Sequence, residues 1–188
     1  IQRIGSLMEV IRGLLNLKEK HRGAVVTIGN FDGVHRGHQS ILKEVRVRAE
    51  ALGVPAMLIC FEPQPKEFFD LYNAPARLTR FREKVDLLSS QGIDYVYCVK
   101  FDDRARTMTA VEFVRILVEQ IRVTALYVGD DFRFGFDRSG DFQLYYRRHY
   151  ELACLEYADD QQSLSRCESA LRTVCISPVS RLCPAAPI

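Results

Sequence analysis

Two histidines three residues apart are the side chains of this sequence best placed to do chemistry. His35 and His38 close the run TIGNFDGVHRGH at 27–38, and Gly37 stands between them. An apolar segment precedes the run and a helical pattern follows it, so both imidazoles should share one face of a first helical turn. Free backbone N–H groups and the helix dipole favour anions there, and Gly37 has no side chain to keep an anion away. This spacing predicts a site for a polyphosphate.

A short H-x-G-H pattern also arises by chance, so the elements around it must support the interpretation. Apolar segments predict four strands, at 24–28, 54–61, 95–101 and 125–128. Apolar residues at helical spacing predict helices between them, at 37–52, from 81 to the glycine at 92, and from the capping box at 109–112 to 121. This alternation predicts a doubly wound α/β fold with a parallel sheet.

The unusual residues of the sequence fall where the predicted strands end. The histidine run follows the first strand, 61–63 the second, 101–102 the third and 129–132 the fourth. The carboxyl ends of parallel strands meet at one edge of the sheet, where ligands of such folds bind. We therefore expect one site built from several loops.

Three of these segments have competing interpretations. In 128–141, Arg133 and Arg138 could hold phosphate, and Phe132, Phe134 and Phe136 could stack on a planar ring. The alternative is a rigid loop folded on its own aromatics. The prolines of 62–65 should interrupt regular structure, which leaves either a stiff connection or a binding loop. The basic run 77–80 precedes a helix, where such charge is usually solvated.

The overall composition narrows the class of protein. With 188 residues, 47% of them hydrophobic, the chain suits one well-buried domain. A net charge of +2 gives no reason to expect nucleic acid or an anionic membrane as a partner. The apolar runs are too short for a membrane span, and we expect no secretory leader. Cys60 and Cys98 lie in strand-like runs without metal-type spacing, so we expect reduced, buried thiols and a cytoplasmic location. The oligomeric state stays open.

Five segments together resemble the bacterial bifunctional riboflavin kinase/FMN adenylyltransferases, the FAD synthetases. These segments are 27–38, 61–65, 77–79, 108–113 and 128–135, in the family's order and at its spacing within 8–144. The resemblance is to the adenylyltransferase half, which belongs to the HxGH nucleotidyltransferase superfamily and has a Rossmann-like sheet. It implies transfer of AMP from ATP to FMN with Mg²⁺, giving FAD and pyrophosphate in the route from riboflavin.

The resemblance also implies roles for individual residues. His35 and His38 would be catalytic, because they would stabilise the charge that develops on the bridge between the α- and β-phosphates. Other residues would bind the two substrates: Gly29, Asn30, Phe31, Gly37, Asp131 and Arg133 for ATP, and Phe61, Glu62, Pro63, Gln64 and Pro65 for FMN. No protein ligand to a metal is expected.

The sequence departs from the family's pattern near its end. We expect an adenylyltransferase domain over 8–166 and an aberrant, disordered tail over 167–188, without the family's R-[IV]-S-S-T motif or its riboflavin kinase barrel. Codons read in a shifted frame from Cys167 permit Arg, Ile or Val, Ser, Ser or Ala, and Thr. A frameshift is therefore one hypothesis, and a genuine tail is the other. Without the motif, adenylyltransferase activity would be weak or absent.

Two further functions stay open at this stage. One is a non-catalytic flavin- or nucleotide-binding remnant, which would keep the site without turnover. The other is a different HxGH nucleotidyltransferase, acting on a pantetheine or alcohol phosphate. The segments at 62–65 and 128–135 favour FMN over these substrates.

Overall fold

A single parallel sheet organises the protein, as the sequence predicted. The computed structural model describes residues 8–129 and 132–147. Its five strands pair in the order β1-β4-β3-β2-β5, all parallel. They are β1 (Glu9–Arg12), β2 (Val25–Ile28), β3 (Ala56–Glu62), β4 (Tyr95–Lys100) and β5 (Ala125–Tyr127). The last four correspond to the predicted strands, so the doubly wound α/β fold is confirmed.

One of the five strands, β1, was not predicted from the sequence. It is only four residues long, it begins and ends with a charged residue, and it lies at the edge of the sheet beside β4. Ile11 is its one buried residue. An edge strand of this kind lacks the continuous apolar run that marks a central parallel strand.

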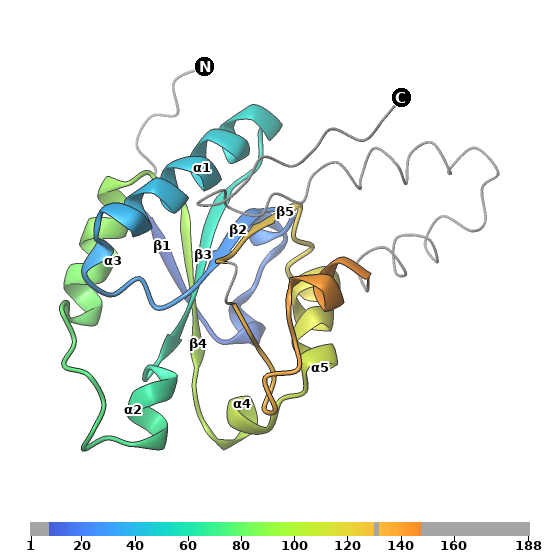
Figure 1. Ribbon diagram of the computed structural model, residues 1–188. Coiled ribbons are helices and arrows are strands. Elements are labelled where there is room, and N and C mark those ends of the chain that lie inside the picture. The colour runs from blue at the N-terminus through green and yellow to red at the C-terminus, as the bar shows by residue number, and fades with distance from the viewer. Residues whose placement is uncertain (1–7, 130–131, 148–188) are drawn as a thin grey trace.

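Helices cover both faces of the sheet (Figure 1), with α1 (Arg36–Leu52) and α3 (Phe81–Ser90) on one face and α5 (Ala110–Arg115) on the other. Two short helices, α2 (Pro65–Phe69) and α4 (Asp103–Thr107), follow β3 and β4 directly. Single turns complete the path: η1 (Leu14–Asn16), η2 (Glu19–His21) and η3 (Asp32–Val34). The helix expected to run from 110 to 121 is instead α5 followed by a π-helical segment, η4 (Ile116–Gln120).

Local sequence signals account for where these helices begin and end. The Thr109 hydroxyl accepts a hydrogen bond from the backbone N–H of Glu112, and the Glu112 carboxylate accepts one from the N–H of Thr109. This reciprocal pair is the predicted capping box of α5. Helix α1 ends at Gly53, whose φ of 68° is the left-handed conformation that terminates many helices.

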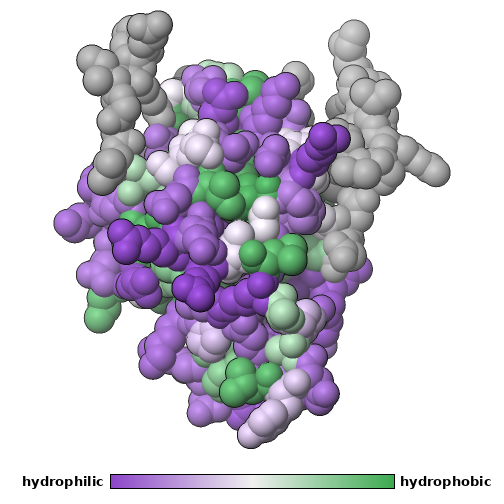
Figure 2. Space-filling view, turned by 90° about the vertical axis from the view of Figure 1, so that its left-hand side faces the viewer, coloured by the Kyte–Doolittle hydropathy of each residue, from purple (hydrophilic) through white to green (hydrophobic). Residues whose placement is uncertain are grey.

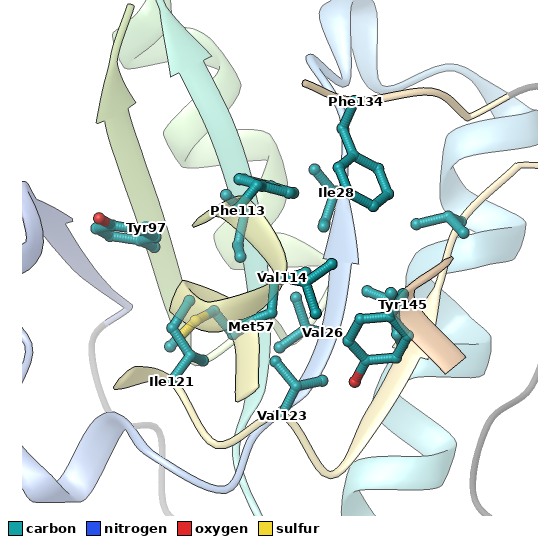
Figure 3. Close-up of a cluster of buried hydrophobic side chains, with 14 of the residues drawn as sticks. Val26, Ile28, Met57, Tyr97, Phe113, Val114, Ile121, Val123, Phe134 and Tyr145 are labelled. Carbon is teal, nitrogen blue, oxygen red and sulfur yellow. The ribbon is translucent and has the colours of Figure 1, made fainter. Parts of the chain in front are cut away.

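Two apolar layers hold the helices to the sheet. In the first, Phe113 and Val114 of α5 pack against Val26, Ile28 and Met57 of the strands (Figure 3). In the second, Leu42 and Val45 of α1 and Leu88 of α3 pack against the opposite face. Burying each such side chain contributes about 1.5–3 kcal/mol. The outward side of α1 and α3 is mostly hydrophilic (Figure 2), as amphipathic surface helices require.

Two expectations about membranes and cysteines can be compared with the described part of the chain. None of the helices in residues 8–129 and 132–147 combines the length and apolar character needed to cross a membrane. Cys60 and Cys98 are free, buried thiols, as predicted. The expected tail at 167–188 lies outside the described residues.

The strand order determines where a ligand should bind. From β2 the chain proceeds outward through β3 to β4 and then returns to place β5 on the other side of β2. In open α/β sheets the ligand crevice lies beyond the carboxyl ends of the strands at such a switch point. The histidine turn follows β2, so it lies at this position.

Two glycines with similar φ should differ in their tolerance of a side chain. A Cβ at Gly135 (φ 85°) would lie 2.8 Å from the backbone nitrogen of Ala110, whereas a Cβ at Gly53 (φ 68°) would meet nothing within 4 Å. We expect Gly53→Ala to lower the free energy of unfolding by about 1–2 kcal/mol, the cost of the left-handed conformation alone. Gly135→Ala should cost more, because it adds a clash with backbone. Urea denaturation of both variants measures this, and equal losses would contradict the clash.

Candidate active site

The turn between β2 and α1 is conformationally strained. Phe31 and Val34 have φ values of 48° and 38°, which residues with a Cβ rarely adopt. Such residues cost about 1–3 kcal/mol each and persist only when their surroundings hold them. Phe31 is only 4% exposed, and Val34 is also buried. Packing of these side chains in the core therefore helps to keep the backbone in this conformation. Strain of this kind is common at functional sites.

The two predicted catalytic histidines lie in direct contact. Their rings stack with centroids 3.7 Å apart, and the His38 ring also lies 4.6 Å from that of Phe31. His35 is the N-cap of α1, and its Nδ1 accepts a hydrogen bond from the backbone N–H of His38 at 3.4 Å. His35 is exposed and His38 is partly buried. The pair forms one continuous imidazole surface at the start of a helix.

Gly37 lies against the His35 ring. A Cβ at this position would lie 3.2 Å from Cε1 of His35, so the missing side chain makes room for the imidazole. That an anion can approach the Gly37 backbone stays a prediction.

The environment of His38 keeps its imidazole neutral. Burial, with the neighbouring His35 charge, lowers the pKa of His38 from 6.5 to about 4, although Asp32 acts in the opposite direction. Its Nδ1 is buried and has no hydrogen-bond partner among the described residues. Buried polar atoms are nearly always paired, so this nitrogen is a candidate for a contact with a ligand or water.

Asp32 fastens the turn to the segment before α3. Its carboxylate accepts hydrogen bonds from the backbone N–H groups of Leu78 and Thr79 at 2.8 and 2.9 Å, and from the Thr79 hydroxyl at 3.0 Å. The same hydroxyl accepts a bond from the N–H of Gly33. Burial acts to raise the pKa of Asp32, but these bonds and the charge of Lys84 outweigh it and lower the pKa. Sequence reasoning did not assign Asp32 or Thr79 to the site.

The 62–65 segment is more regular than its prolines suggested. Glu62 is the last residue of β3, its peptide bond to Pro63 is cis, and Pro65 is the first residue of α2. Only Pro63 and Gln64 lie outside regular structure. Proline is well suited to the first position of a helix, where its missing N–H has no intrahelical partner to lose.

The basic run 77–80 is also not simply solvated. The Arg77 guanidinium forms ion pairs with both Glu62 and Glu67, which joins the end of β3 to α2. The hydrogen bond from Arg77, together with one from the Gln64 backbone, lowers the pKa of Glu67 against the effect of burial. Glu62 Oε2 and Gln64 Nε2 are buried without partners among the described residues. One acceptor and one donor are thus available here to a ligand.

Asn30 brings the two predicted binding segments together. Its side-chain Nδ2 donates to Gln64 Oε1 at 3.3 Å, so the predicted ATP side contacts the predicted FMN side. Gly29 extends the β2–β3 ladder, because its N–H donates to the carbonyl of Ile59 at 3.0 Å. The histidine turn and the 62–65 segment therefore form one structural unit.

Aromatic rings line the sheet edge beside this unit. Phe61 contacts Phe101 and Phe113, with ring centroids 5.9 and 6.4 Å away, and Phe68 also packs on Phe101. Phe61 is only partly buried. The result is an apolar wall next to the polar atoms of Glu62 and Gln64, which suits a planar ligand with polar edges.

The segment after β5 partly follows the second interpretation, a loop packed on its own aromatics. Phe134 is buried in the core against Phe113, and the partly buried Phe132 packs on Phe134. Phe136 is 63% exposed. Arg133 is exposed, and its guanidinium donates to the carbonyl of Phe132. Asp131 lies outside the described residues.

No group of three or more His, Cys, Asp or Glu residues in 8–129 and 132–147 could hold a metal ion. Magnesium in enzymes of polyphosphates is usually bound through substrate phosphates and one or two carboxylates, with water completing its coordination.

The fold and the candidate site define an α/β domain with a histidine-bearing turn at the carboxyl edge of its parallel sheet. The sequence profile of the FAD synthetase family matches residues 17–164. The chain belongs to the FAD synthetase family.

Similar proteins carry names consistent with this membership. The chain is 55% identical over 136 residues to the bifunctional riboflavin kinase/FMN adenylyltransferase of Pseudomonas fluorescens, which covers 72% of this chain and 43% of the relative. It is 47% identical over 168 residues to the protein of that name from Escherichia coli K12. This match covers 88% of this chain and 52% of the relative. The chain thus spans about half the length of these relatives.

Solved structures with a similar fold include one described as a macrolide-efflux protein from Streptococcus pneumoniae, with a TM-score of 0.63 and 23% sequence identity. The match covers 73% of this chain and 48% of that one. At this level of identity the likeness supports the architecture and nothing about activity.

The environment of His38 leads to a measurable titration. We expect its ring protons to titrate by NMR with a midpoint near pH 4, and His35→Ala to raise that midpoint by removing a neighbouring positive charge. Since the folded-state pKa lies below the unfolded value, the stability from this group is present above about pH 6.5 and is lost as the pH falls towards 4. A midpoint near 6.5 in the folded protein would contradict this account.

Proposed function

We propose that this chain transfers the AMP group of ATP to FMN, giving FAD and pyrophosphate. The observation that carries the proposal is the connection between the histidine turn and the 62–65 segment through Asn30 and Gln64. A phosphate-binding turn and a half-apolar, half-polar wall are thereby held side by side. The names of the relatives support the same reaction.

The reaction asks the protein for positioning and charge stabilisation. A phosphate oxygen of FMN attacks the α-phosphorus of ATP, the new P–O bond forms, and the bond from the α-phosphorus to the bridging oxygen breaks. Negative charge then develops on the leaving pyrophosphate. His35 and His38 would stabilise it through hydrogen bonds, because preorganised donors at the position of developing charge are effective catalysts. No covalent enzyme intermediate is required.

The remaining residues would hold the two substrates. We assign the ATP phosphates to the turn formed by Gly29, Asn30, Phe31 and Gly37, and the flavin to Phe61 and the 62–65 segment. Asp131 and Arg133 keep their proposed place on the ATP side, on the strength of the family resemblance. Mg²⁺ would accompany the ATP phosphates and neutralise part of their charge. The free, buried thiols of Cys60 and Cys98 support a cytoplasmic location.

The mutation that tests the catalytic assignment is His38→Ala. We expect it to lower the rate of FAD formation by about 10²–10³, the usual effect of removing one charge-stabilising donor. Far-UV circular dichroism should stay unchanged, since His38 is only partly buried. Lys43→Ala, an exposed change on the same helix, is the matched control. Turnover of His38→Ala close to that of the control would refute the assignment.

A product assay separates the proposed function from its alternatives. With ATP, Mg²⁺ and FMN, an adenylyltransferase forms FAD and pyrophosphate in equal amounts, as chromatography and a pyrophosphate assay would show. A binding remnant would quench flavin fluorescence without releasing pyrophosphate. A nucleotidyltransferase of other specificity would release pyrophosphate with a pantetheine phosphate and not with FMN.

A further inference from the structure

A buried lysine lies beneath the candidate site and has no role in the reaction just described. Lys84 belongs to α3, and only 2% of it is exposed. Lysine is almost never fully buried unless its ammonium group is paired, because desolvating the charge is costly. Its Nζ donates a hydrogen bond to the backbone carbonyl of Asn30 at 3.0 Å. The buried charge is therefore directed at the histidine turn.

Two carboxylates of the site also interact with this ammonium group. The charge of Lys84 contributes to lowering the pKa of Asp32 and that of Glu67. Asp32 is part of the histidine turn, and Glu67 is part of α2 beyond the 62–65 segment. The ring of Phe81 lies 5.6 Å from Nζ and shields it from one side. Lys84 thus contacts the histidine turn directly. Its charge also acts on Asp32 of that turn and on Glu67 of α2.

The hydrogen bond to Asn30 connects Lys84 with both the histidine turn and the 62–65 segment. The Asn30 carbonyl binds Lys84, while the Asn30 side chain binds Gln64. Asp32, two residues later, holds the backbone of Leu78 and Thr79. A displacement of Asn30 would therefore move the histidine turn and the 62–65 segment together.

We propose that Lys84 is a positioning residue that holds the histidine turn and the 62–65 segment in one arrangement. It acts through Asn30 and Asp32 and does not itself contact the reacting atoms. A cation is suited to this task because it satisfies a backbone carbonyl and attracts two carboxylates at once. The consequence for catalysis rests on the proposed function, whereas the effect on the turn does not.

The test compares Lys84→Met with Arg82→Met. Methionine preserves most of the length and apolar stem of lysine but cannot donate a hydrogen bond. Arg82 is exposed on the same helix, so its substitution removes one positive charge without touching the turn. We expect Lys84→Met to accelerate hydrogen exchange at the amides of Gly33, Leu78 and Thr79 by about tenfold or more, as loss of a buried hydrogen bond would. Arg82→Met should leave these amides unchanged.

Kinetics provide the second measurement. Normalised to the folded fraction, Lys84→Met should lower kcat/KM about tenfold for both ATP and FMN. Both constants should fall because the histidine turn and the 62–65 segment are displaced together. A lysine that served only the stability of the fold would leave these constants unchanged in the folded fraction. Unchanged amide exchange in Lys84→Met would overturn the proposal.

Two outcomes need separate treatment. If Lys84→Met does not fold, Lys84→Gln, which keeps a shorter neutral donor, replaces it in both measurements. Failure of both variants to fold would assign Lys84 to fold stability and overturn the proposal. If the unmodified protein makes no FAD, the proposed function fails, and the exchange measurement alone still decides the role of Lys84.

Discussion

The carboxylate of Asp32 is the interaction on which the site depends most. The turn that carries the histidines contains two non-glycine residues at positive φ, an arrangement that would relax without external support. Asp32 supplies that support by accepting three hydrogen bonds from Leu78 and Thr79. Because these bonds favour its ionised form, the turn is held by a charge that persists at neutral pH.

The rest of the site extends outward from this turn. Asn30 reaches Gln64, and Arg77 joins Glu62 to Glu67, so three segments of the sheet edge support one another. The strand order places this set of contacts at the switch point beside β2. A site assembled in this way can present the neutral imidazole of His38 to an anion. It also keeps unpaired polar atoms, at Glu62 and Gln64, available to a second ligand.

Much of the fold was predictable, because its signals are local. Apolar runs and capping residues identified β2 to β5 and the start of α5, whereas the edge strand β1 and the short helices α2 and α4 were not predicted. The candidate site was predictable where a motif carries it, as with His35 and His38. How side chains pack could not be predicted. Phe134 joined the core, which favours one of the two interpretations of its segment, and Gly37 lies against the His35 ring.

The sequence by itself determined the parallel α/β architecture, the histidine pair and the edge of the sheet at which the site forms. These follow from periodicity and spacing within a few neighbouring residues. Only the tertiary structure decided which partners Thr79, Arg77 and Lys84 contact. Thr79 and Lys84 contact partners 47 and 54 positions away in the chain, and no local pattern encodes such a pairing. Burial makes these contacts necessary, because a buried charged or polar group without a partner lowers the stability of the fold.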